Sequence, residues 1–197
     1  MDLQESVYKS LCNTIDNLTH QLEHLPPKLA KASELMAQTL LSDHKILVCG
    51  NAMTLPLCGM LSSFLMNRHD HERPSLPAIN LCGDNHLISA IARDTHYNDV
   101  FSKQIRALGQ QGDLLIALSI DGNCASIIQA VQAAHDQEMS IIAIYGGEDG
   151  NIGSLLASSD IELKTGSKSA ARVLEGQLVI LNTLTALIDQ QIFGFAI

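Results

Sequence analysis

Two turns in this sequence carry residues suited to binding an anion, and each follows a short apolar run. CGNAMT at 49–54 includes the end of the run ILVC, and SIDGNCAS at 119–126 follows LLIAL. In the second turn, Gly122 permits close approach of a ligand to the backbone, and Asn123 is expected to cap a helix that starts there. Backbone amides at a helix start favour a phosphate. The Asp121 carboxylate opposes a phosphate dianion, so an ordinary strand–turn–helix connection stays open as the alternative.

Metal ligation is the other chemistry to consider, because HDHE at 69–72 resembles a ligand cluster. It lies in a charged turn between a helix and Pro74, and we interpret its histidines as structural or solvated. The adjoining ERP at 72–74 is interpreted as a solvated helix exit. Three further histidines, His86, His96 and His135, occur singly, without a carboxylate or cysteine at ligand spacing. None of the motifs GxSxG, GxxxxGK[ST] and HExxH occurs.

Composition narrows the class of partner. The chain has 197 residues, is 46% hydrophobic and carries a net charge of −9 with only 12 Lys and Arg. It has no basic run to neutralise a phosphate backbone and no Trp for base stacking, so direct nucleic-acid binding is disfavoured. No apolar run reaches the roughly 18 residues of a membrane span, and MDLQESVYKS lacks the apolar segment of a secretory signal. We expect neither a membrane nor a nucleic-acid partner.

The cysteines indicate the compartment. Their odd number and their dispersed spacing, without CxxC, favour reduced thiols over disulfides. The protein is therefore expected to be cytoplasmic. The five are Cys12, Cys49, Cys58, Cys82 and Cys124.

Hydrophobic periodicity predicts a helical pair over 1–42, broken at the two prolines 26 and 27, and then an α/β core. The expected strands are 46–49, 77–81, 113–119, 140–145 and 160–163. The expected helices are 54–67, 85–93, 98–108, 124–137, 151–157 and 169–191. Strands that are apolar on both faces and alternate with helices predict a parallel, doubly wound sheet. We expect one domain over 1–197, with oligomerisation helices at 1–42 and the α/β core at 43–197, since the helical pair cannot hide its apolar faces alone.

Several segments together resemble a SIS (sugar isomerase) domain of the phosphoheptose isomerase group, which also includes the replication-initiator-associating protein DiaA. They are CGN at 49–51, NRHDHERPSLPAINL at 67–81, DVFSKQIRALGQQGDLLIALS at 99–119, GN at 122–123 and AARVLEGQ at 170–177. The resemblance implies a five-stranded flavodoxin-like sheet, a cytoplasmic homotetramer and phosphosugar sites at subunit interfaces.

The binding motifs of this group are altered here. The family's CGNGGS reads CGNAMT, so Ala52 and Met53 replace glycines while Thr54 keeps a hydroxyl for a helix cap. The family's STSGNS reads SIDGNC at 119–124, and its Asn-Asp pair keeps only Asp94. The ligand-binding positions that the resemblance implies are Asn51, Ala52, Met53, Thr54, Asp94, Ser119, Asp121, Gly122, Asn123 and Cys124.

The catalytic positions implied by the resemblance differ more. The isomerases place a His and a Glu one turn apart, able to share a metal, where this chain has Met60 and Phe64. A family glutamine corresponds to Leu174, and the acid/base histidine to Asn182. Isomerisation needs a proton acceptor and a group that polarises the carbonyl. These four residues offer neither, so we expect no catalytic residue and no metal at these positions.

The leading hypothesis from the sequence is therefore a catalytically inactive SIS-fold protein that binds a partner as DiaA does, with the replication initiator as the implied partner. The apolar tail residues Ile192, Phe193, Phe195 and Ile197 are expected to pack into the oligomer rather than form a docking patch. One alternative is an active sedoheptulose 7-phosphate isomerase that requires zinc, with His69 or His71 recruited as ligands. Another is a sensor of a sugar derivative that binds through the remaining polar groups, Asn51, Asp94, Ser119 and Asn123.

Overall fold

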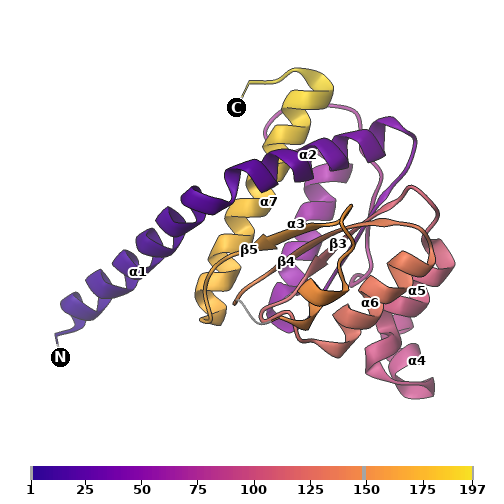
Figure 1. Ribbon diagram of the computed structural model, residues 1–197, viewed down its shortest axis with the longest axis horizontal. Coiled ribbons are helices and arrows are strands. Elements are labelled where there is room, and N and C mark those ends of the chain that lie inside the picture. The colour runs from indigo at the N-terminus through magenta and orange to yellow at the C-terminus, as the bar shows by residue number, and fades with distance from the viewer. Residues whose placement is uncertain (1, 148–149, 197) are drawn as a thin grey trace.

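A single parallel sheet of five strands, in the order β2-β1-β3-β4-β5, organises the computed structural model, which describes residues 2–147 and 150–196 (Figure 1). The strands are β1 (Ile46–Gly50), β2 (Ala78–Asn80), β3 (Leu114–Leu118), β4 (Ser140–Tyr145) and β5 (Ile161–Lys164). Ile46 of β1 pairs with Ala78 on one side and with Leu114 on the other. Strands β1 and β3 are buried along their whole length, as expected for strands between two helical layers. The predicted doubly wound flavodoxin-like sheet is confirmed.

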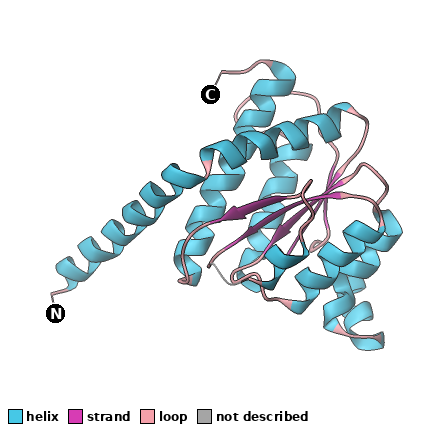
Figure 2. Cartoon of the chain, viewed as in Figure 1, coloured by secondary structure: helices cyan, strands magenta, loops and turns pink. Residues whose placement is uncertain are grey.

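The helices lie close to their predicted positions. They are α1 (Leu3–His24), α2 (Pro26–Leu41), α3 (Leu55–Met66), α4 (Asn85–Asp94), α5 (Val100–Leu108), α6 (Ala125–Asp136) and α7 (Ala170–Phe193). Short 3-10 helices precede α3 and α5, as η1 (Ala52–Thr54) and η2 (Tyr97–Asp99). The helix predicted over 151–157 is instead the single 3-10 helix η3 (Asn151–Leu155), so that prediction was wrong in type. Helices α5 and α6 pack together on one side of the sheet, and α3 and α7 pack together on the other (Figure 2).

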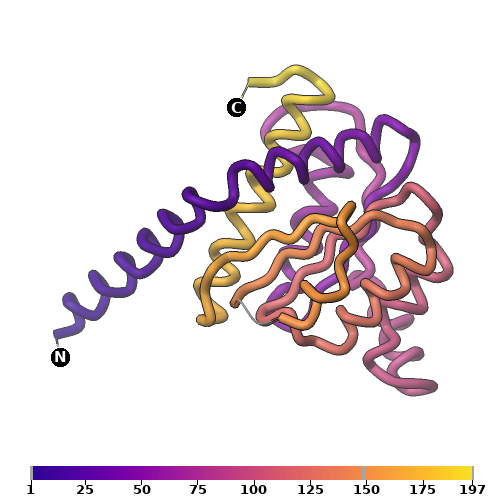
Figure 3. The backbone as a smooth tube through the Cα atoms, in the orientation of Figure 1, coloured from indigo at the N-terminus to yellow at the C-terminus, as the bar shows by residue number. Residues whose placement is uncertain are grey.

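Helix α1 projects from the body of the protein (Figure 3). Its end at His24 and the start of α2 at Pro26 match the predicted break, because proline suits the first helical turn. Only Gln21 of α1 is buried, and its amide donates to the Thr165 carbonyl at 3.2 Å. The row of apolar side chains along α1 remains exposed: Leu3, Val7, Tyr8, Leu11, Ile15 and Leu22.

Helix α7 is the one helix of the described chain that could cross a membrane by its length and composition alone. Within this fold it contacts α2 and α3, and its residues Val173, Ile180 and Leu184 are buried. Its burial is therefore that of a helix packed within the layer that α3 and α7 form on one side of the sheet. The tail packs back on the fold in part: Ile192 and Phe193 contact the core, and the Phe195 ring lies 4.6 Å from the ring of His71. Ile197 lies outside the described residues.

A buried ion pair joins α7 to the turn that follows α3. The Nε of Arg73 lies 2.6 Å from Oδ1 of Asp189, and the two side chains are 0% and 4% exposed. Arg73 also donates to the carbonyls of Phe64 and Leu65, at 2.6 and 2.8 Å. The interpretation of ERP as a solvated exit was wrong for this arginine, because pairing and carbonyl contacts compensate its burial.

We predict that Asp189→Ala lowers the free energy of unfolding by about 3–5 kcal/mol, because it leaves the Arg73 charge buried without its partner. Urea denaturation measures this loss. The control is Asp136→Ala, which removes an exposed partner of Arg106 at 3.7 Å and should cost less than about 1 kcal/mol. Equal, small losses for the two variants would contradict the structural role of the pair.

Candidate functional site

The strand order reverses between β1 and β3, and the loops after these strands leave the same edge of the sheet. Strand β2 lies on the outer side of β1, while β4 lies on the outer side of β3. In open parallel sheets, the crevice at such a switch point is where ligands bind. The loop after β1 holds Asn51, and the loop after β3 holds Ser119 to Cys124, so the fold brings the two predicted turns together.

Asn51 connects these two loops. Its Nδ2 donates to the Cys124 Sγ at 2.8 Å and makes a very short contact with the Ser126 Oγ. The thiol and the Ser126 hydroxyl are themselves 3.5 Å apart. The Oδ1 of Asn51 accepts from the Tyr97 hydroxyl at 3.1 Å. We call these four residues, Asn51, Tyr97, Cys124 and Ser126, the Asn51 cluster.

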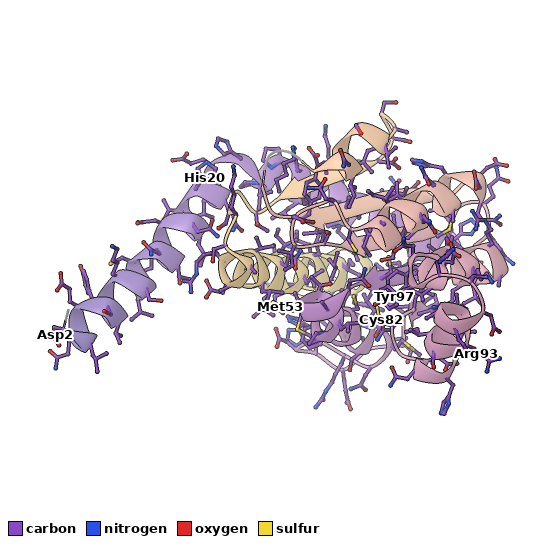
Figure 4. The ribbon with its side chains drawn as sticks, turned by 90° about the horizontal axis from the view of Figure 1, so that it is seen from below. Asp2, His20, Met53, Cys82, Arg93 and Tyr97 are labelled. Carbon is purple, nitrogen blue, oxygen red and sulfur yellow. The ribbon has the colours of Figure 1, made fainter. Side chains whose placement is uncertain are left out.

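The sequence-based site prediction missed two members of this cluster, Ser126 and Tyr97; Ser126 lies in the quoted turn SIDGNCAS, whereas Tyr97 lies far from it in the chain. Tyr97 lies in η2, after β2 and α4, in a segment without a motif. The only signal available was its place in the connection between the second and third predicted strands. Burial, and then the neighbouring Cys124 and Cys82, raise the pKa of Tyr97, so it is a neutral hydroxyl donor at neutral pH. Figure 4 labels Tyr97 and Cys82 close together in the view and Arg93 farther out, in α4.

The turn after β1 is tightly built. A side chain at Gly50 would place a Cβ 2.5 Å from the Thr54 Oγ1 and 2.8 Å from the Cys58 Sγ, so only glycine fits. Thr54 precedes α3, but its hydroxyl makes no capping bond to the helix. The hydroxyl donates instead to the Asn51 carbonyl at 2.9 Å, which corrects the expected cap. Ala52 has a φ of +48°, in the region that favours glycine, and Met53 is exposed.

The turn after β3 has its polar groups largely engaged with one another. The Ser119 hydroxyl accepts from the Gly122 amide at 3.1 Å, and Asp121 Oδ1 accepts from the Asn123 amide at 2.9 Å. Asn123 was expected to cap α6, but it does not. Its Oδ1 accepts from the Asn151 amide at 3.0 Å, and the cap position belongs to Cys124, without a side-chain bond. A cavity of about 280 Å³ opens beside this turn, lined by Ile120, Asp121, Asn123, Gly146, Gly147, Ser167 and Lys168.

Asp94 stands apart from the Asn51 cluster. It is the last residue of α4, its side chain is 61% exposed, and its Oδ1 lies 3.1 Å from the Nε of Arg93. The structure thus brings the predicted residues Asn51 and Cys124 into direct contact, places Ser119, Asp121 and Asn123 in the adjoining turn, and leaves Asp94 on the surface.

Three buried thiols lie beneath the cluster, at Cys49, Cys58 and Cys82. The Cys82 thiol donates to the Gly50 carbonyl at 3.2 Å. Burial, and then the thiols of Cys82 and Cys124, raise the pKa of Cys49, and a hydrogen bond with Cys82 together with burial raises that of Cys58. Cys49 and Cys58 therefore stay protonated at neutral pH.

The comparisons with known proteins agree with this geometry. The SIS domain family model matches residues 11–146. The chain belongs to the SIS domain family. A curated relative named phosphoheptose isomerase, from Chromohalobacter salexigens, is 46% identical over 194 residues, which cover 98% of each chain. Another of that name, from Shewanella sp. (strain ANA-3), is 41% identical and covers 96% of each. Solved phosphoheptose isomerases from Neisseria gonorrhoeae and Francisella tularensis superpose with a TM-score of 0.91 at 33% and 32% identity, each over 96% of this chain and all of theirs.

These relatives overturn the leading hypothesis from the sequence. The prediction of an inactive, DiaA-like binding protein is contradicted, because nearly full-length relatives at 46% and 41% identity carry the name of the isomerase. The prediction had given most weight to a few substituted positions, whereas the similarity extends over the whole scaffold, including the strands that form the crevice. The replication initiator as partner stays a prediction that no comparison tests.

We predict that Ala52→Gly raises the free energy of unfolding by up to about 1 kcal/mol. A left-handed backbone costs an L-residue about 1–2 kcal/mol, and the greater flexibility of glycine in the unfolded chain offsets part of the gain. Thermal or urea unfolding measures the change. Ala90→Gly, at an exposed position inside α4, is the matched control and should lose about 0.5–1 kcal/mol. A loss of the same size at both positions would contradict strain at Ala52.

Proposed function

We propose that this protein is a phosphosugar isomerase of the phosphoheptose isomerase type, which interconverts the ketose and aldose forms of a seven-carbon sugar phosphate such as sedoheptulose 7-phosphate. The observation that carries the proposal is the Asn51 cluster at the switch point of the sheet. A relative named phosphoheptose isomerase, which aligns with this chain over 98% of each, supports it. The cluster supplies amide, thiol and hydroxyl groups at the ends of two buried strands.

The reaction moves one proton between adjacent carbons. A base takes the proton from the hydroxyl-bearing carbon next to the carbonyl, and the carbonyl oxygen gains a proton to give an enediol. The other hydroxyl of the enediol then loses its proton and becomes the new carbonyl, while a proton returns to the former carbonyl carbon. Cys124 is the one member of the Asn51 cluster with a thiol, a side chain that can serve as a general acid or base, so we assign the proton transfer to it. The Asn51 Nδ2 positions the Cys124 sulfur through its 2.8 Å hydrogen bond. The neutral Tyr97 hydroxyl in turn donates to the Asn51 Oδ1 and orients the amide.

Cys124→Ala should lower kcat by about 10²–10⁴-fold, because it removes the assigned proton carrier. The measurement follows formation of the aldose phosphate from sedoheptulose 7-phosphate over time. Cys12→Ala removes a partly exposed thiol of α1 and serves as the control, with kcat unchanged. If both variants retain the wild-type rate, Cys124 is not the base.

We further propose that the protein is a cytoplasmic homotetramer in which α1 helices pack on neighbouring protomers. The apolar row along α1 supports this, since side chains such as Leu11 and Ile15 are 60% and 62% exposed in a single chain. An apolar groove between α1, α2 and α7, of about 550 Å³, continues this row and offers a complementary surface. Its lining includes Leu18, Leu22 and Leu187.

Ile15→Glu should shift the protein to a smaller assembly, because it places a charge in the proposed apolar interface. Size-exclusion chromatography with light scattering measures the mass. Thr19→Glu adds the same charge one turn along at an exposed polar position of α1, and should leave the assembly intact. An unchanged mass for Ile15→Glu would contradict packing through this row.

A further inference from the structure

Helix α3 presents side chains for packing where the resemblance implies metal ligands. Met60 is half-buried and packs against the core. Phe64, one turn later, makes an edge-to-face contact with the His69 ring at 4.8 Å, and its carbonyl accepts from Arg73 at 2.6 Å. Zinc in proteins is held by thiolate, imidazole or carboxylate groups. A thioether and a phenyl ring supply none of these, so this face of α3 is not a zinc-binding face.

The other two catalytic positions that the resemblance implies lie in α7, and they do not supply the zinc ligands that α3 lacks. Leu174 has no donor atom, and Asn182 has only a neutral amide. Both residues are half-buried. The four positions together therefore offer one weak oxygen ligand for an ion that usually takes three or four strong ones.

The histidines that could be recruited are committed elsewhere. His69 lies against Phe64, and its Nδ1 is 3.2 Å from the Asp70 carboxylate. The His71 ring is tilted against the Phe195 ring, with the ring centres 4.6 Å apart. Both line a small cavity of about 90 Å³ beside the Arg73–Asp189 pair. Within residues 2–147 and 150–196, no group of three or more His, Cys, Asp or Glu side chains is arranged to hold a metal ion. The alternative in which His69 or His71 is recruited as a zinc ligand therefore finds no support in this geometry.

The polar groups at the switch point of the sheet form hydrogen bonds with one another. In the Asn51 cluster the amide donates to a thiol and a hydroxyl and accepts from a phenol. Such a set can orient sugar hydroxyls and carry a proton through Cys124. We infer that the sugar site of this protein works without a resident metal ion and uses the Asn51 cluster in its place. This inference rests on the proposed function for its catalytic part, but not for its metal-binding part.

The test compares zinc binding by the full-length wild-type protein with that of the quadruple variant Met60→His, Phe64→Glu, Leu174→Gln and Asn182→His. Each is equilibrated with excess zinc, dialysed and analysed for bound metal, and isothermal titration with zinc alone gives the affinity. We expect the wild type to lose its zinc on dialysis and the variant to retain about one ion per chain. Because the quadruple variant can fail to fold, the double variant Met60→His and Phe64→Glu is measured as well, and is expected to bind zinc more tightly than the wild type.

Turnover of sedoheptulose 7-phosphate before and after EDTA treatment separates the two claims. An unchanged rate after chelation supports the metal-independent site. Stoichiometric, dialysis-resistant zinc in the wild type overturns the inference, and a rate abolished by EDTA and restored by zinc does the same. Absence of turnover with and without zinc, in a wild type that binds no zinc, overturns the proposed isomerase function and leaves the metal-binding conclusion standing.

Discussion

The hydrogen bonds of Asn51 join the two loops that leave the sheet at its switch point, and the arrangement of the crevice depends on them. The amide bridges from the turn after β1 to the start of α6 and accepts from Tyr97, which follows α4. Three chain segments far apart in sequence thus meet at one side chain. The parallel sheet makes this possible, because β1 and β3 are neighbours and end at the same edge. The tight turn at Gly50 then holds Asn51 in place.

The scaffold carries side chains that differ in chemistry from those in the motifs of the phosphoheptose isomerase group. Met60 packs against the core and Phe64 contacts the His69 ring, and neither side chain offers a thiolate, imidazole or carboxylate group. Ala52 retains a left-handed backbone that glycine would adopt without strain. The pairing of β1 with β3 sets the positions of the two turns, and the side chains that meet between them carry an amide, a thiol, a hydroxyl and a phenol. Solved relatives at 33% and 32% identity share this scaffold, with a TM-score of 0.91.

The sheet was predictable because its signals are local. LLIAL is apolar on both faces, and Pro26 both ends one helix and starts the next. Side-chain partners were not predictable, because they depend on contacts between distant segments. Asn123 bonds to Asn151 instead of capping α6, Arg73 reaches Asp189 across 116 positions, and Tyr97 meets Asn51 across 46. Function was misjudged for a related reason: four substituted positions indicate which chemistry is missing, but not which groups the fold places there in return.

The most direct test of the account is proton exchange at the reacting carbons. The wild-type protein is incubated with sedoheptulose 7-phosphate in deuterium oxide, and the sugar is followed by proton NMR. Isomerisation through an enediol with a thiol as proton carrier predicts formation of the aldose together with deuterium at the carbon that receives the proton. A sugar that binds in the crevice but shows neither aldose formation nor deuterium incorporation would contradict the account.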